Sequence, residues 1–204
     1  GGDLSSEVES SKVVVQNTAP TPPLQVELLP KSATVVSLLT CQYEPSATDL
    51  DGDPIDFEHS WIVNAYVNPG TTSVAMVAGQ LQRAPGELAQ KGDAVRCRVQ
   101  STDGEQASPP TDSNVVLLMN APPGGGAVLV QPGAPTVTDT LECKVSGFTD
   151  PDGDALTWKT VWTVDGEVVD GEEGSTLGGE HFAKGAKVTC SVVPIDGEAE
   201  GSPV

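Results

Sequence analysis

Short stretches of this chain alternate between apolar and polar residues, the pattern of a β-strand with one buried face. In the stretch around Trp162, Trp158 and Val164 share the face of Trp162, whereas Lys159 and Thr163 lie on the opposite face. Alternation of this kind does not fit a helix, in which apolar residues recur every three to four positions. The pattern therefore predicts half-buried strands.

The same alternation surrounds the cysteines of the second half of the chain. Leu141 shares the face of Cys143, and Val188 and Val192 share the face of Cys190. Glycine and proline account for 22 and 17 of the 204 residues, which is enough to interrupt any long helix and to separate the strands by turns. The chain is therefore expected to be all-β.

The sequence also matches itself, because one order of landmarks occurs in each half. A cysteine is followed by an acidic loop, a tryptophan, a Lys-Gly turn, a second cysteine and an Asp-Gly-Glu loop. The matched segments are Cys41 with Cys143, 49–53 with 150–154, Trp61 with Trp162, 91–92 with 184–185, Cys97 with Cys190, and 103–105 with 196–198. An internal repeat of this length indicates an array of similar modules.

This order of landmarks resembles the immunoglobulin fold, in which strands B and F carry cysteines and strand C carries a tryptophan. With the Asn-Thr-Ala-Pro linker at 17–20 and the Asn-Ala-Pro linker at 120–122, the chain resembles the tandem Ig-like repeats, similar to PKD and cadherin-like modules, of large bacterial surface and secreted proteins. The resemblance implies two tandem immunoglobulin-like β-sandwiches at 17–120 and 121–204, after an N-terminal extension at 1–16.

Four cysteines allow three disulfide connectivities, and their spacing alone does not choose among them; free buried cysteines are a further alternative. The resemblance implies one inter-sheet disulfide in each module, Cys41 with Cys97 and Cys143 with Cys190. Disulfides persist in oxidising compartments, so a secreted or cell-surface, extracellular location is expected.

Alternating carboxylates form the two Asp-x-Asp-Gly-Asp loops. Calcium takes six to eight oxygen ligands, and the immunoglobulin fold places the loop after strand B beside the loop after strand F. The expected calcium ligands are Asp49, Asp51, Asp53, Asp103 and Glu105 in the first module and Asp150, Asp152, Asp154, Asp196 and Glu198 in the second. The expected Kd is on the order of 10⁻⁴–10⁻³ M. Alternatively, the aspartates only supply good turn chemistry.

The ends of the chain do not coincide with the ends of the modules. Residues 11–16 align with 113–118, which are expected to form the last strand of the first module. The extension is therefore expected to be a last strand without a module, and the second module to lack its own. Donation of this strand to the next copy would generate a head-to-tail filament. The residues expected at this interface are Lys12, Val13, Val14, Val15 and Gln16 on the donor and Val188, Cys190 and Val192 on the acceptor.

Two alternatives explain the same ends. The chain could be a stretch of a longer array, in which every last strand follows its own module covalently. The second module could also be truncated and open at one edge.

The net charge of −19 and the pI near 4.1 argue against nucleic acid and anionic lipid as partners. No apolar run is long enough for membrane insertion. Head-to-tail self-association is the expected interaction, and a glycan or a host or cell receptor is a further one. The two histidines, His59 and His181, do not align, and no nucleophile motif is present, so an enzyme is not expected.

The sequence thus predicts a structural subunit of an extracellular fibre or surface array, assembled by strand donation and stiffened by calcium. A spacer or stalk segment of a large multi-repeat adhesin is one alternative. A carbohydrate-binding module is another, with Tyr66 as the most exposed aromatic residue.

Overall fold

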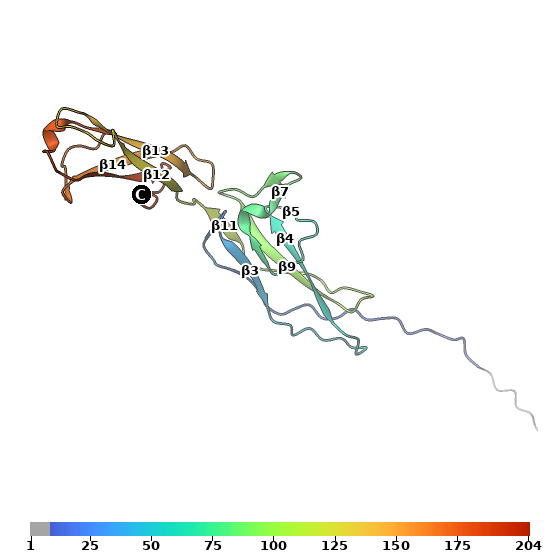
Figure 1. Ribbon diagram of the computed structural model, residues 1–204. Helices are drawn as coiled ribbons and strands as arrows, with labels where there is room; N and C mark the ends of the chain where they lie inside the picture. Colours follow the sequence, from blue (N-terminus) through green and yellow to red (C-terminus); the bar gives the residue numbers. More distant parts are fainter. Residues whose placement is uncertain (1–8) are drawn as a thin grey trace, which may run out of the picture.

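The computed structural model describes residues 9–204, which form two β-sandwiches placed end to end (Figure 1). The chain passes from the first sandwich to the second through a short linker around residue 120. The N-terminal segment leaves the first sandwich at the pole farthest from the second. The molecule is thus an elongated array of two modules with two distinct ends.

Two sheets and a short hairpin make up the first module. One sheet has the strand order β1-β3-β6, the other β2-β11-β9-β4-β5 with β10 also paired to β9, and the hairpin is β7-β8. The elements are β1 (Val26–Leu29), β2 (Ala33–Thr34), β3 (Leu38–Tyr43), β4 (Asp56–Val63), β5 (Tyr66–Val67), β6 (Ala75–Val77), η1 (Ala78–Gln80), β7 (Gln82–Ala84), β8 (Glu87–Leu88), β9 (Ala94–Thr102), β10 (Thr111–Asp112) and β11 (Val116–Met119).

Two three-stranded sheets make up the second module, with the orders β12-β13-β16 and β15-β14-β17. The elements are β12 (Gly124–Gln131), β13 (Leu141–Thr149), β14 (Thr157–Val164), β15 (Glu167–Val168), β16 (Thr176–Leu177), η2 (Gly179–His181) and β17 (Val188–Ile195). The fold prediction of two tandem immunoglobulin-like sandwiches is confirmed.

Each module is held by a disulfide and a buried tryptophan. The disulfides join Cys41 to Cys97 and Cys143 to Cys190, so the predicted connectivity is confirmed. Trp61 is fully buried, and its indole N–H donates to the carbonyl of Ser73 at 2.8 Å. The equivalent Trp162 is also fully buried and bonds Gly174 O at 2.9 Å. Each disulfide thus lies in a core that a tryptophan of strand β4 or β14 completes. The two disulfides also require an oxidising environment for the folded chain.

The alternation seen in the sequence sets the strand faces. Along β9, Val95, Cys97 and Val99 are buried, and the residues between them are half-buried. Trp158 lies on the same face of β14 as Trp162, but it is 46% exposed because it sits near the end of the sandwich.

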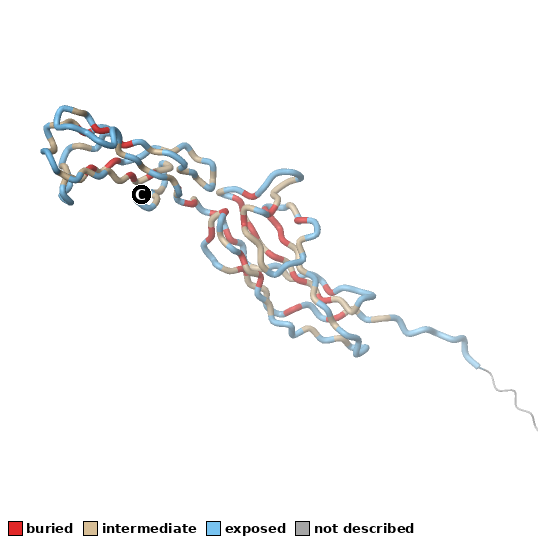
Figure 2. The backbone as a smooth tube through the Cα atoms, in the orientation of Figure 1, coloured by how far each residue is buried: buried red, intermediate tan, exposed pale blue. Residues whose placement is uncertain are grey.

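The two cores differ greatly in size. Sixteen buried residues form the core of the first module, whereas only five form the core of the second. Figure 2 shows the same contrast, with buried positions concentrated in the first module and a mostly exposed or half-buried second module. The difference arises at one edge, where β11 covers the first core and no described strand covers the second.

Candidate functional site

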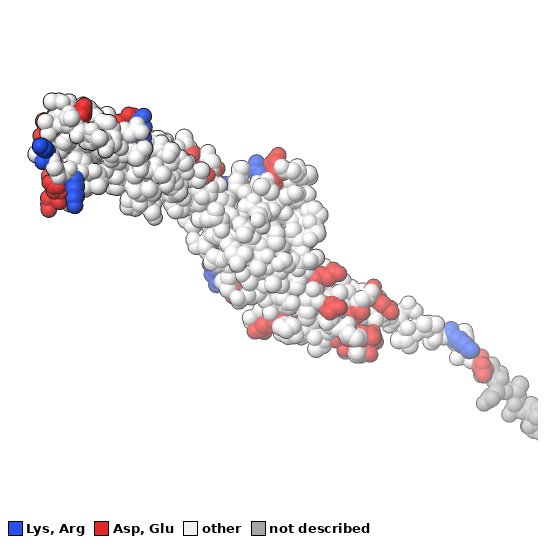
Figure 3. Space-filling view, in the orientation of Figure 1, with Lys and Arg blue, Asp and Glu red and all other residues white. Residues whose placement is uncertain are grey.

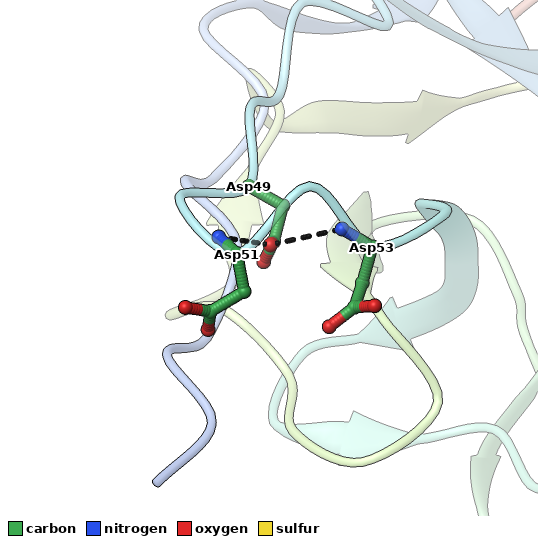
Figure 4. A group of neighbouring side chains, drawn as sticks. All are labelled: Asp49, Asp51 and Asp53. Atoms are coloured by element: carbon green, nitrogen blue, oxygen red, sulfur yellow. Dashed lines mark hydrogen bonds between the residues drawn. The ribbon is translucent and has the colours of Figure 1, made fainter. Parts of the chain in front are cut away.

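The first acidic loop is closed by one of its own carboxylates (Figure 4). Asp49 Oδ1 accepts hydrogen bonds from the backbone N–H groups of Asp51, Gly52 and Asp53, at 2.8, 2.9 and 3.2 Å. Gly52 has a φ of +85°, a conformation that glycine adopts without steric cost. Asp49 Oδ2 is buried and has no hydrogen-bond partner among the described residues. The loop chemistry expected for Asp-Gly turns is therefore present.

The second aspartate of this loop holds the incoming chain. Asp51 Oδ2 accepts the backbone N–H of Thr18 at 2.6 Å. Beside it, the side-chain amide of Asn17 donates to Asp103 Oδ2 at 2.9 Å. This hydrogen bond, together with the backbone N–H of Gln106, lowers the pKa of the Asp103 carboxyl. The loops after β3 and β9 thus meet at one pole and fix residues 17–18 between them.

The second module repeats this arrangement. Asp150 Oδ1 accepts the N–H groups of Asp152 and Asp154, and Asp152 Oδ2 accepts the N–H of Ala121 at 2.6 Å. The Asn120 amide donates to Asp196 Oδ2 at 2.9 Å and lowers the pKa of that carboxyl. Both acidic poles therefore bind, through hydrogen bonds, the linker that precedes their own module.

A lysine of the first module binds the acidic pole of the second. Lys91 Nζ donates to Asp154 Oδ2 at 2.6 Å, to Glu198 Oε1 at 2.7 Å and to Asn120 Oδ1 at 3.0 Å. The two carboxylates raise the pKa of Lys91, the Asp154 hydrogen bond contributing most. The Lys-Gly turn of one module is thus an ionic contact for the next module. Sequence reasoning missed this role, although the repeated Lys-Gly turn and the repeated Asn of the linkers were its signal.

The predicted calcium ligands are brought together in part. In each loop, one oxygen of all three aspartates lies within 4.8 Å of the others, for Asp49, Asp51 and Asp53 and for Asp150, Asp152 and Asp154. The loops that follow β9 and β17 join them through the linker asparagines. Figure 3 shows acidic side chains gathered at the pole of the first module from which the N-terminal segment departs.

At that first pole, two carboxylates lack the partner that their counterparts have. Asp53 and Glu105 are exposed, and within residues 9–204 neither side chain makes a hydrogen bond or ion pair. Their counterparts in the second module are Asp154 and Glu198, which bind Lys91. Within residues 9–204, the acidic pole of the first module therefore lacks the cationic partner that Lys91 provides at the second pole.

A groove of about 540 Å³ opens into the core of the second module. Its apolar lining includes Val130, Pro135, Val137, Leu141, Phe182 and Val188. The equivalent residues of the first module are Leu28, Ala33, Val35, Leu39, Ala89 and Val95, all of which are buried. They are covered by Val116 and Leu118 of β11, which are 1% and 2% exposed. The groove of the second module therefore lies where β11 lies in the first module.

The edge of β17 beside the groove is partly occupied. Val192 exchanges two backbone hydrogen bonds with Val204, as Thr111 pairs with Val99 in the first module. Since these backbone groups are already used, the part of β17 left for pairing with a donor strand is Val188–Cys190. Beyond this pair, no described strand pairs with β17 along Val188–Cys190 on the side opposite β14.

The N-terminal segment carries three exposed valines. Val13, Val14 and Val15 are 86, 81 and 89% exposed and belong to no strand. The linker contacts match Asn17 with Asn120 and Thr18 with Ala121, one residue away from the alignment used for the sequence prediction. Continued backward, this match equates Val13 with Val116 and Val15 with Leu118. The same match equates Lys12, Val14 and Gln16 with Val115, Leu117 and Met119, which are exposed in the first module.

The residues considered for catalysis and glycan binding lie elsewhere. His59 is half-buried beside Tyr43, with ring centroids 5.0 Å apart, and burial lowers its pKa. His181 lies in the second module, 3.3 Å from Glu172. Tyr66, on the short strand β5, is half-buried rather than fully exposed.

The two helical turns of residues 9–204 are three residues each, too short to cross a membrane.

Comparison with known proteins gives structural neighbours only. No protein-family model matches the chain, and no curated protein shows significant similarity to it. Among solved structures, a two-domain fibronectin type-III segment of chicken tenascin is similar, with 14% identity and a TM-score of 0.37 over 90% of this chain and 96% of that one. The FN1–FN3 segment of chicken CNTN1 is similar with 12% identity and a TM-score of 0.30, over 95% and 68%.

Proposed function

We propose that this chain is a secreted or surface-exposed structural subunit that assembles head to tail by donating its N-terminal strand. The observation that carries this proposal is the groove of the second module, which is lined by the residues that β11 covers in the first. A partly open sandwich edge with unpaired backbone groups recruits a further strand. The exposed valines of residues 13–15 supply apolar side chains for such a strand.

The first module supplies the geometry of the proposed contact. There β11 pairs antiparallel with β9, Val116 opposite Val95, and parallel with β2, Leu118 opposite Ala33. Transferred to the second module, Val13 of the donor lies opposite Val188. Val15 lies opposite Pro135 and fills the groove. The donor strand would thus extend the β15-β14-β17 sheet of the acceptor at β17, as β11 extends the sheet of its own module at β9.

This contact joins different surfaces of the two copies. The donor segment leaves one pole of the first module, whereas the groove lies in the second module. A contact of this heterologous kind repeats without closing unless its rotation generates a ring. The proposed assembly is therefore an open fibre in which each step adds two modules.

Deletion of residues 1–16 is expected to abolish self-association. Of this segment, the described residues 9–16 form no strand and make no hydrogen bond to either module. The first module should therefore keep its fold and its thermal transition. Sedimentation velocity over a range of concentrations measures the effect. If the shortened chain associates like the full chain, donation of this strand is not the mechanism. If the full chain and the shortened chain are both monomeric, strand donation is equally excluded, and the chain acts as a spacer whose groove is filled in another way.

We also propose calcium as a ligand of the acidic poles. The aspartate oxygens converge within 4.8 Å, and Asp49 Oδ2 is buried with no hydrogen bond from the described residues. These features support a site for a hard cation, since calcium accepts carboxylate oxygens in flexible geometry. At the second pole the ammonium group of Lys91 already lies among the carboxylates, so calcium binding is proposed to be stronger at the first pole.

Calorimetric titration tests this site. Calcium is expected to bind with a Kd on the order of 10⁻⁴–10⁻³ M. Exchange of Asp51 and Asp53 for asparagine should remove most of the binding heat, because it removes two charges but keeps the side-chain size. The matched control replaces Asp152 and Asp154, and it should leave the first site intact. Equal heats for the wild-type chain and the Asp51→Asn/Asp53→Asn variant would contradict the assignment.

A further inference from the structure

The junction between the two modules is a template for the junction between two copies. The Lys91-Gly92 turn of the first module faces the acidic pole of the second, and Lys91 binds Asp154, Glu198 and Asn120 there. The second module has its own Lys-Gly turn, Lys184-Gly185. The same three acceptor groups exist at the pole of the first module. They are Asp53, Glu105 and Asn17.

We propose that Lys184 of one copy binds Asp53, Glu105 and the side-chain carbonyl of Asn17 in the next copy. Lys184 is exposed and makes no ion pair with any residue of 9–204. Asp53 and Glu105 are equally without a partner in the described part of the chain. The two sets are therefore complementary in charge and unused within one copy, and Lys184 competes with calcium for Asp53 and Glu105.

Lys184 also lies at the place that this contact requires. It borders the groove, together with Ala186 and Val188. In the first module, Gly92 donates its N–H to Leu118 O at 2.7 Å, and Leu118 donates its N–H to Asp93 O at 2.9 Å. The Lys-Gly turn thus holds the end of β11 immediately before the linker asparagine. A donor strand in the second groove would bring its own Asn17 to the same position beside Lys184.

This inference rests on the proposed strand donation and adds specificity to it. The strand itself contributes apolar contacts and backbone pairing, which many strands could provide. The lysine contact selects a strand that is followed by an acidic pole. It also offers a local opposite charge to chains that repel one another through a net charge of −19.

A charge exchange on the full chain tests the contact in the presence of chelator. In the variant Lys184→Glu, both surfaces of the proposed contact are acidic. In the variant Asp53→Lys/Glu105→Lys, both are basic. Each alone is expected to associate at least about tenfold more weakly than the wild type, because like charges then face each other. In an equimolar mixture every contact can form between opposite charges. The mixture is therefore expected to regain association within about threefold of wild type, by sedimentation equilibrium.

Lys159→Glu is the matched control, since Lys159 is exposed on β14 and makes no ion pair within residues 9–204. It gives the same net charge as Lys184→Glu and should associate like the wild type. If Lys184→Glu behaves like this control while deletion of residues 1–16 still abolishes association, the lysine contact is wrong and strand donation stands. If the mixture stays as weak as its components, the contact is overturned. If the wild-type chain does not associate, both inferences fail.

Discussion

Replacement of Val13 and Val15 by aspartate is expected to reduce self-association of this chain at least about a hundredfold. In the proposed contact these side chains take the places of Val116 and Leu118, which are almost fully buried. Burial of a valine side chain contributes about 1.5–3 kcal/mol, and a carboxylate in the same place would lose its hydration without a partner. Sedimentation equilibrium measures the dissociation constant of each variant.

Val14→Asp is the control for this variant. Val14 corresponds to Leu117, which is 61% exposed in the first module, so an aspartate there should remain in water. Association within about threefold of wild type is expected, because an exposed substitution changes the free energy little. A result in which Val14→Asp weakens association and Val13→Asp/Val15→Asp does not would mean that the opposite face of the strand enters the groove.

Removal of the second disulfide, through Cys143→Ala and Cys190→Ala, is expected to lower the Tm of the second module by roughly 15–25 °C. The bridge closes a loop with a sequence separation of 47 residues, and loss of such a cross-link costs about 4 kcal/mol. Cys143 is itself one of the five buried residues of this core, so only four others would remain to hold the sandwich together. Scanning calorimetry of the full chain, below the concentration at which it associates, measures the transition of each module.

The first disulfide provides the comparison. The pair Cys41 and Cys97 closes a loop of similar separation, 56 residues, in a module whose core has sixteen buried residues. Its removal should lower the transition of the first module by a similar amount and still leave that module folded at 25 °C. An unchanged second transition in the Cys143→Ala/Cys190→Ala variant would show that the small core suffices without its cross-link.

The fold was predictable because it depends on residues that repeat. Cys41, Trp61 and Cys97 return in the same order as Cys143, Trp162 and Cys190, and each set lies on the inward face of its strands. A disulfide and a buried indole tolerate few other residue types, so these positions show clearly in one sequence. Their pairing followed once the order resembled a known sandwich.

The contacts at the poles of the modules were predictable only in part, for two physical reasons. A strand has a period of two, so the one-residue difference between the sequence alignment and the linker contacts of Asn17 turns every valine to the other face. The partners of Lys91 are Asp154 and Glu198, which lie far away along the chain, so the repeated Lys-Gly turn alone did not identify them. Such contacts become visible only when the modules are placed in space.

Negative-stain imaging of the purified full chain, with its concentration raised in steps, tests the central claim most directly. Head-to-tail strand donation predicts unbranched fibres whose axial repeat is the length of two modules and which are lost on dilution. Chains that remain single two-module rods at every concentration would contradict the proposal that one copy completes the second module of the next.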